Sequence, residues 1–339
     1  MPQLRQDRFT KEWVFVATEC VKHPQDLVVK RAEKGLVVFD PHCPFCPGNE
    51  DQTPPEVLRI PSPSKCGWAV RVVPSRFNGL GTNTVSVRMA RRSLCAGEGF
   101  AIHEVIVETP DHSLTTALLP EAQVATLLRA SKVRYDELTL DSRIIGHATL
   151  FKNHGAQAGA TLEHSHCQLI ATPGVSAQVC TRLQGARRHY DEFRECIFCT
   201  VVQEELHAQT RIVMTTDHFV ALEPFASTTP FCTHIYPRRH MANFGEISSD
   251  EISDLARILR RVLAKLYFGL ANPDFNYTIR TAPTQEAGVN YYHWYLSIVP
   301  YLMPQPSLEM RSGVFVNTVL PEKAAEFLRE VPVERAIPA

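Results

Sequence analysis

Three features that this chain lacks exclude whole classes of protein. No apolar run in its 339 residues approaches the roughly 18 that a membrane-spanning helix needs. Its first ten residues are polar and lack the apolar segment of a secretory signal peptide. Lysine and arginine (35) are balanced by aspartate and glutamate (36), so the net charge is −1 and no basic excess favours nucleic acid. We therefore expect a cytoplasmic protein without membrane or nucleic-acid partners.

The composition is that of an ordinary globular protein, with 44% hydrophobic and 21% charged residues. A chain of this length can bury a large core and favours two domains over one. The ten cysteines include two C-x-x-C pairs, Cys43 with Cys46 and Cys196 with Cys199. In a cytoplasmic protein such pairs favour metal ligands over disulfides.

The hydrophobic pattern repeats along the chain. In the first half we expect a long helix over residues 120–138 and strands over residues 13–16, 36–39, 68–73, 104–108 and 149–151. In the second half we expect a helix beginning near Ser248, where Ser248 and Glu251 form a capping box, and strands over residues 219–222, 233–236 and 277–279. The pattern predicts a duplicated α+β fold in which each copy is a mostly antiparallel sheet with a long packed helix. We divide the chain into residues 1–190, the catalytic unit, and residues 191–339.

Histidines follow each C-x-x-C pair at matched spacing. His112 precedes His164 by 52 residues, and His240 precedes His293 by 53. Two thiolates and two imidazoles form a closed tetrahedral site that suits zinc and leaves no position for a reacting water. A single C-x-x-C is also compatible with a buried thiol pair, but two matched sets favour two structural zinc ions. His234 is a rival ligand for the second set.

The segment 163–168 carries the candidate chemistry. In a strand, His164 and His166 face the same side because side chains alternate. With His164 on a metal, His166 is free to attack a phosphoryl group. The preceding loop, residues 152–161, is rich in small residues whose backbone N–H groups can approach a phosphate. Gln168, again on that side, can donate an amide hydrogen bond. The alternative is a polar strand edge with two solvated histidines.

Superposing the two repeats by their spacing places Tyr295 opposite His166. A tyrosine cannot supply imidazole chemistry, so we expect one active site per chain, in the first repeat.

Several of these motifs together resemble one enzyme family. His164-Ser165-His166-Cys167-Gln168, Asn153 with its glycine loop, the first C-x-x-C pair and the segment 110–113 are similar to galactose-1-phosphate uridylyltransferase, of the histidine-triad superfamily. The similarity extends over nearly the whole chain. It implies duplicated histidine-triad-like domains and a double displacement, in which His166 takes a nucleotide from a nucleotide sugar, releases hexose 1-phosphate and passes the nucleotide to a second acceptor.

The resemblance also implies substrate contacts. The residues expected to hold the phosphates are Asn153, Gly159, Thr161, Ser165 and Gln168. Glu309 matches a residue that binds sugar hydroxyls, and the nucleoside is expected beside Arg76, Phe77 and Asn78. The family is typically a homodimer.

Two departures leave alternatives open. The second C-x-x-C pair also resembles the ADP-glucose phosphorylases, in which inorganic phosphate is the acceptor. Cys20 stands where the family usually has an arginine. Without that arginine, a bidentate contact to phosphate would be missing. We expect transfer between UDP-glucose and hexose 1-phosphate, with ADP-glucose phosphorolysis as the alternative. A zinc-knuckle binding module without catalysis is a remote third hypothesis.

Overall fold

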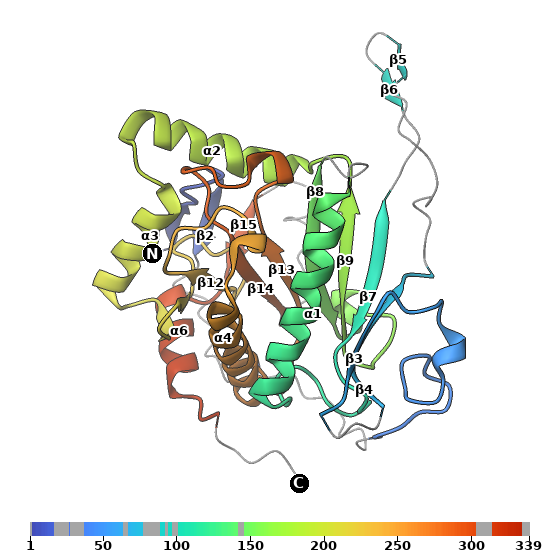
Figure 1. Ribbon diagram of the computed structural model, residues 1–339. Coiled ribbons are helices and arrows are strands. Elements are labelled where there is room, and N and C mark those ends of the chain that lie inside the picture. Colours follow the sequence, from blue (N-terminus) through green and yellow to red (C-terminus); the bar gives the residue numbers. More distant parts are fainter. Residues whose placement is uncertain are drawn as a thin grey trace.

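The computed structural model describes residues 2–16, 27, 37–63, 67–76, 89–91, 94–96, 101–141, 146–302 and 314–333. Its centre is one continuous ten-stranded sheet whose pairings are all antiparallel (Figure 1). In spatial order the strands are β10 (Ile212–Thr215), β11 (Phe219–Leu222), β12 (Thr233–Pro237), β14 (Tyr295–Tyr301), β13 (Asp274–Arg280), β8 (His147–His154), β9 (His166–Thr172), β7 (Ile102–Val107), β4 (Trp68–Pro74) and β3 (Leu58–Pro61).

The sheet order confirms the duplication. From its outer edge inward, the first repeat contributes β3, β4, β7, β9 and β8, and the second contributes β10, β11, β12, β14 and β13 in the same pattern. The two halves meet where β8 pairs with β13, over residues 151–154 and 275–278. Strand β9, which begins at His166, therefore corresponds to β14, and β8 corresponds to β13.

One long helix from each repeat packs on the same face of this sheet (Figure 1). They are α1 (Glu121–Leu140) and α4 (Ser249–Gly269), and both contribute to a core shared by the two repeats. The capping box predicted at Ser248 is present. Each buried leucine or isoleucine of α4 contributes about 1.5–3 kcal/mol of transfer free energy, so the shared core holds the repeats together.

In the part of the chain that the structure describes, three further helices and two small sheets lie around this centre. The helices are α2 (Ala177–Phe193), α3 (Ile197–Ala208) and α6 (Pro321–Glu330). The strands are β1 (Gln3–Gln6), β2 (Trp13–Val16) and β15 (Phe315–Asn317) in one sheet, and β5 (Met89–Arg91) and β6 (Leu94–Ala96) in the other. Of these eight elements, the sequence pattern predicted only β2.

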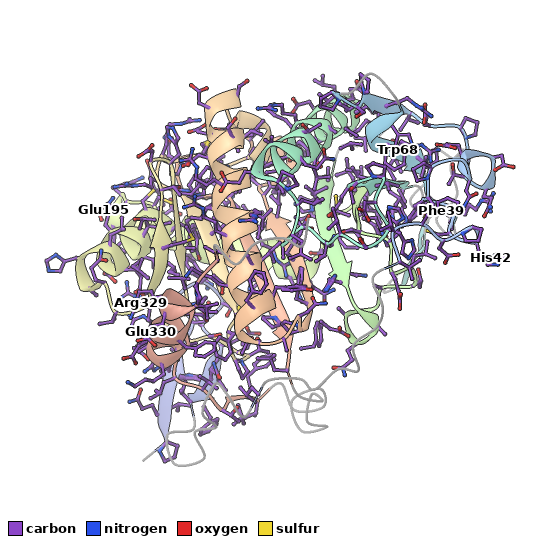
Figure 2. The ribbon with its side chains drawn as sticks, turned by 90° about the horizontal axis from the view of Figure 1, so that it is seen from below. Phe39, His42, Trp68, Glu195, Arg329 and Glu330 are labelled. Atoms are coloured by element: carbon purple, nitrogen blue, oxygen red, sulfur yellow. The ribbon has the colours of Figure 1, made fainter. Side chains whose placement is uncertain are left out.

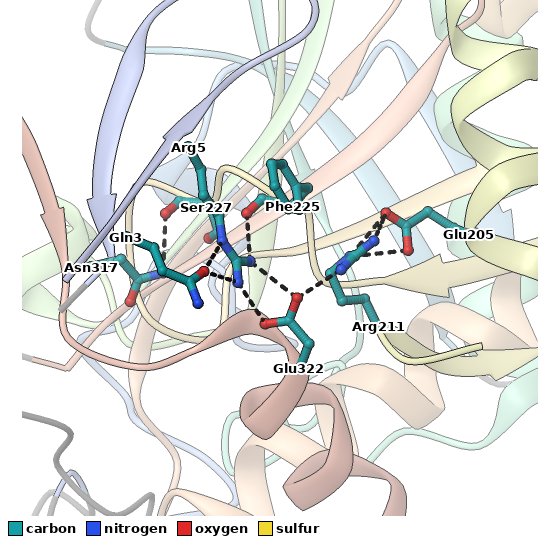
Figure 3. Close-up of polar contacts among 8 residues, drawn as sticks. All are labelled: Gln3, Arg5, Glu205, Arg211, Phe225, Ser227, Asn317 and Glu322. Atoms are coloured by element: carbon teal, nitrogen blue, oxygen red, sulfur yellow. Dashed lines mark hydrogen bonds and ion pairs between the residues drawn. The ribbon is translucent and has the colours of Figure 1, made fainter. Parts of the chain in front are cut away.

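A carboxylate bridges both ends of the chain to the second repeat. Glu322 of α6 accepts hydrogen bonds from Arg5 at 3.0 Å and from Arg211 at 2.6 Å (Figure 3). Arg211 also bonds Glu205 of α3, and Arg5 donates to the carbonyl of Phe225 at 3.0 Å. This network fixes β1 and α6 beside β10 and α3.

The strand predicted over residues 36–39 is wrong in the part that the structure describes. Residues 37–39 have no regular secondary structure, and their apolar side chains are about half exposed. The carbonyl of Val38 accepts a hydrogen bond from the backbone N–H of His112 at 3.0 Å. This hydrogen bond holds residues 37–39 beside His112, next to the first C-x-x-C turn, and these residues do not pair with a strand of the sheet.

Candidate active site and metal centres

The first predicted ligand set comes together at the end of the sheet formed by the first repeat. Cys43 and Cys46 lie in a turn, and their sulfur atoms are 3.5 and 3.6 Å from Nδ1 of His164. Nδ1 of His112 lies 3.4 Å from the Cys46 sulfur. All four ligand atoms lie within 4.8 Å of one another. A tetrahedral zinc with bonds of about 2.3 Å to sulfur and 2.05 Å to nitrogen has S–N edges of about 3.6 Å, so the geometry fits zinc.

Backbone carbonyls orient the ligating rings. The carbonyl of Thr109 lies 2.8 Å from Nε2 of His164, so Nε2 carries the proton and Nδ1 presents its lone pair to the other ligands. Cys43, Cys46 and His164 are buried and His112 is half-buried, so most of this site is shielded from water.

The second predicted set lies at the opposite end of the molecule. Cys196 is the N-cap of α3 and Cys199 lies in its first turn. The Cys199 sulfur is 3.3 Å from Nδ1 of His240 and 3.4 Å from Nδ1 of His293. Figure 2 shows Glu195, which precedes Cys196, far from the labelled Phe39, His42 and Trp68 around the first set.

His234, the rival ligand, lies outside the second set. Its ring contacts the Tyr236 hydroxyl at 3.0 Å and lies 3.8 Å from the Cys232 sulfur. The second set borders a cavity of about 650 Å³ lined in part by Cys196, Cys199 and His240.

His166 is the first residue of β9. Its Nδ1 lies 2.8 Å from the backbone carbonyl of His164, which can only accept, so Nδ1 carries the proton and Nε2 keeps its lone pair. Burial lowers the pKa of His166 and thereby favours the neutral imidazole. The edge of the Phe45 ring packs against it, with centroids 5.3 Å apart. The ring is thus neutral, oriented and nucleophilic at one nitrogen.

Gln168 lies on the same side of β9 as His166. Between them, Cys167 points into the core beneath α1 and α4. The side-chain oxygen of Gln168 accepts a hydrogen bond from Nε2 of His103 at 2.9 Å, which leaves its amide N–H groups available. His103 was not predicted, because its position beside a predicted strand is the only sign of it in the sequence.

The loop between β8 and β9 is shaped by glycine and anchored by the second repeat. Gly155 and Gly159 have φ of 83° and 84°, which L side chains rarely adopt. A Cβ on Gly155 would also lie 1.8 Å from the Asp274 carboxylate, which accepts a hydrogen bond from the N–H of Gln157 at 2.7 Å. Thr161 is exposed.

Asn153 lies on β8 at the junction of the two repeats. Its side-chain oxygen accepts a hydrogen bond from Asn276 of β13 at 2.7 Å, so the amide group of Asn153 is oriented with its N–H groups free for a ligand. Asn276 also donates to the carbonyl of Ala158 at 2.9 Å. Neither Asn276 nor Asp274 was predicted, because both contacts join segments more than 100 residues apart.

A buried ion pair lies beneath the start of β9. Lys152 donates to Glu108 at 2.6 Å and to the hydroxyl of Ser165 at 2.8 Å, and that hydroxyl donates to Glu108 at 2.8 Å. Burial opposes the ionised form of Glu108, but Lys152 and the hydroxyl donors hold the pKa of this carboxyl below its usual value. The Ser165 side chain, predicted to contact phosphate, is therefore occupied by these two residues, and only its backbone is available to a ligand.

Comparison with known proteins identifies the family. Residues 1–175 match the family model for the galactose-1-phosphate uridyl transferase N-terminal domain, and residues 182–334 match the model for its C-terminal domain. The chain belongs to the galactose-1-phosphate uridylyltransferase family. It is therefore an enzyme of that family, a nucleotidyltransferase, as the sequence motifs predicted.

Members of the family with different activities resemble the chain over nearly its whole length. ADP-glucose phosphorylase from Arabidopsis thaliana is 32% identical, with 97% of this chain and 93% of that protein covered. Galactose-1-phosphate uridylyltransferase from Thermotoga maritima is 29% identical, with 98% and 100% covered. Among solved structures, the Arabidopsis ADP-glucose phosphorylase with bound ADP-glucose has a TM-score of 0.80 at 31% identity, covering 98% of this chain and 99% of that one. A uridylyltransferase structure has a TM-score of 0.73 at 25% identity, with 97% of each chain covered.

Some predicted features of this family member lie outside the described residues. They are Phe77, Asn78, Glu309 and the departure at Cys20. Arg76 is described and exposed, two residues beyond β4. The predicted domain boundary after residue 190 falls within α2, while the two family models meet between residues 175 and 182. No helix in the described part of the chain is long and apolar enough to cross a membrane.

Proposed function

We propose that this enzyme transfers a nucleotide by double displacement through a covalent nucleotidyl-His166 intermediate. The observation that carries this proposal is the hydrogen bond from Nδ1 of His166 to the carbonyl of His164. It leaves Nε2 unprotonated and fixes the ring, so orientation is achieved before the substrate binds.

In the first half-reaction, Nε2 attacks the nucleotide phosphorus of a nucleotide sugar. The bond from that phosphorus to the bridging oxygen breaks, and hexose 1-phosphate leaves with the bonding electrons. In the second half-reaction, a phosphate oxygen of the acceptor attacks the same phosphorus, and the P–N bond to His166 breaks. The imidazole returns to its starting state, so the cycle consumes no further reactant.

The neighbouring groups would stabilise the charge on the phosphoryl oxygens. Backbone N–H groups of the loop around Gly159, together with the amide groups of Asn153 and Gln168, are the donors available on this side of the sheet. Thr161 would add a hydroxyl. Ser165 would contribute through its backbone, because Glu108 and Lys152 hold its side chain.

The two Cys2His2 sets would each hold one structural zinc ion. The first zinc, on Cys43, Cys46, His112 and His164, would fix the residue whose carbonyl orients His166. The second, on Cys196, Cys199, His240 and His293, would fix the start of α3 beside the second repeat.

Only the first repeat would be catalytic. Tyr295 begins β14 as His166 begins β9, so it occupies the corresponding position. Its ring is buried against Tyr236 and Phe198, and it has no imidazole to attack phosphorus.

Two candidate reactions fit this mechanism. Uridylyl transfer between UDP-glucose and hexose 1-phosphate was favoured on sequence, and it is supported by the likeness to several uridylyltransferases. Adenylyl transfer from ADP-glucose to inorganic phosphate is supported by the second C-x-x-C pair and by 32% identity to the Arabidopsis phosphorylase. The similarities of 32% and 29% are too close to separate them.

Product analysis separates the two reactions. The purified enzyme is offered UDP-glucose or ADP-glucose, each with galactose 1-phosphate or inorganic phosphate, and nucleotides are quantified by chromatography. UDP-galactose formation assigns the uridylyltransferase, whereas ADP formation from ADP-glucose and phosphate assigns the phosphorylase. Absence of nucleotide transfer in all four mixtures would contradict the proposed function.

A further inference from the structure

A second pocket lies on the sheet next to the catalytic strands. It has a volume of about 330 Å³ and is formed mainly by β13 and β14 of the second repeat. Asn153 and Ala158 of the first repeat form its border. The remaining lining residues are Asn276, Thr278, Arg280, Ser297, Val299 and Tyr301.

The strand register relates this pocket to the catalytic site. Phe151 pairs with Gln168 in the first repeat, and Thr278 pairs with Ser297 in the second. Because β8 corresponds to β13 and β9 to β14, Ser297 stands at the position of Gln168. Two residues further along the strand, Arg280 stands at the position of Asn153. The second repeat thus has hydroxyl and guanidinium donors where the first has its two amides.

The polar groups of this pocket favour an anion. Its lining contains one guanidinium and three hydroxyl side chains, and no carboxylate. The Tyr301 hydroxyl donates to Asn276, which leaves the hydroxyls of Thr278 and Ser297 for a ligand. The Nε atom of Arg280 is buried without a hydrogen-bond partner among the described residues. Its only hydrogen bond there is a long one, 3.5 Å, from Nη1 to Gln178 of α2. Burying a guanidinium nitrogen without a partner costs free energy that a bound oxyanion would recover.

A second arginine adds positive charge on the same side of the sheet. Arg182 of α2 also has a buried Nε atom without a partner in the described part of the chain. His234 of β12 pairs with Ser297 and therefore lies on the pocket side of the sheet. Burial and the positive charges of Arg182 and Arg280 together lower the pKa of His234 to about 3. His234 is consequently neutral and does not add to the charge, and Asp7 is the acid that acts on Arg182.

We propose that this pocket is an oxyanion site that binds a phosphate group independently of the nucleotide at His166. The comparison with Asn153 and Gln168 rests on the proposed function, whereas the cavity and the Arg280 Nε atom, unpartnered among the described residues, do not. The ligand is free phosphate or the phosphate of a small monoester, held by Arg280 with the hydroxyls of Thr278 and Ser297.

The test is calorimetric titration of the zinc-loaded His166→Ala enzyme with inorganic phosphate, so that no transfer is required. We expect one site per chain and at least tenfold weaker binding after the additional change Arg280→Gln. Arg280→Lys, which keeps the charge, should recover part of the loss. Arg187→Gln is the matched control, because Arg187 lies exposed on α2 and contacts Glu286 instead of the pocket. Equal melting temperatures of the variants confirm that the fold is intact.

Two further titrations distinguish free phosphate from a sugar monoester, and the proposed pocket from the nucleotide site at His166. Glucose 1-phosphate that binds more tightly than phosphate, with the same dependence on Arg280, identifies a sugar monoester as the ligand. Phosphate that binds more tightly identifies the free ion. Absence of binding, binding unaffected by Arg280→Gln, or complete displacement by saturating ADP and UMP would overturn an independent site. None of these results depends on whether the parent enzyme transfers nucleotides.

Discussion

At the scale of single residues, His166 is defined by the hydrogen bonds around it. The His164 carbonyl fixes its proton, and Phe45 packs against its ring. The duplicated spacing was sufficient to predict the eight Cys and His residues that the structure gathers into two clusters. The role of His166 as nucleophile stays a prediction. The sequence was not sufficient for Asp274, Asn276 or His103. Those residues act through contacts between segments far apart in the sequence, and no local sequence pattern predicts such contacts.

Replacing His166 should remove activity without loosening the fold. We expect His166→Ala to lower turnover by at least 1,000-fold, equivalent to about 4 kcal/mol in the barrier. Melting temperature and zinc content should stay at parental values, because His166 is not among the metal ligands. Retention of more than a tenth of the parental rate would show that another residue is the nucleophile.

The buried pair of Lys152 and Glu108 should be essential to stability. Lys152→Met leaves Glu108 buried without its cation, and we expect a loss of about 3–5 kcal/mol in the free energy of unfolding. Lys132→Met is the control, since the Lys132–Asp136 pair is partly exposed on α1 and should contribute only about 0.5 kcal/mol. Denaturant unfolding measures both, and similar losses would contradict the role of the buried pair.

At the scale of elements, the two helices that pack on the central sheet, α1 and α4, were predicted, and the other described helices were not. α1 and α4 each have an apolar stripe, and α4 also has a capping box at Ser248. The strand expected over residues 36–39 was wrong because an apolar run forms a strand only where a partner strand is available. α2, α3 and α6 were missed. α2 is largely polar and buries only Val179, Gly185 and Ala186, and α3 begins inside a C-x-x-C motif.

The cap of α4 makes a prediction about acid sensitivity. Hydrogen bonds from Arg239 outweigh burial and, with those from Ser248, lower the pKa of Glu251 to about 2 from its usual 4.5. A depressed carboxyl pKa gives stability that is fully present above pH 4.5 and is lost as the pH falls toward 2.

Glu251→Gln should test this assignment. We expect it to cost about 1–2 kcal/mol at pH 7, because the exposed Arg239 limits the strength of the pair and the cap itself contributes about 1 kcal/mol. The variant should also lose less stability than the parent between pH 4.5 and pH 2. Parallel stability curves for the two proteins over that range would show that Glu251 is not the titrating group.

At the scale of the whole molecule, the duplicated sheet separates the two metal sets. In the first set only His112 is partly exposed, whereas in the second Cys199 and His240 are partly exposed and border a cavity, so a chelator should reach the second set faster. We expect about two zinc ions per chain, with the ion of the second set released first. Release of both ions in one step would contradict this difference.

Metal analysis of Cys43→Ser and of Cys199→Ser should show about one ion in each variant. Cys43→Ser should also reduce activity, because its site supports the residue that orients His166.

The same duplication leaves only one repeat with a histidine at the catalytic position, and that asymmetry is the central claim. The most direct measurement is intact-mass analysis, followed by peptide mapping, of enzyme incubated with ADP-glucose or UDP-glucose without an acceptor. We predict a mass increase of one nucleoside monophosphate per chain, acid-labile and located on His166, that disappears when phosphate or hexose 1-phosphate is added. The account would be contradicted if no nucleotide adduct formed with either substrate, if two adducts formed per chain, or if the adduct also formed in His166→Ala.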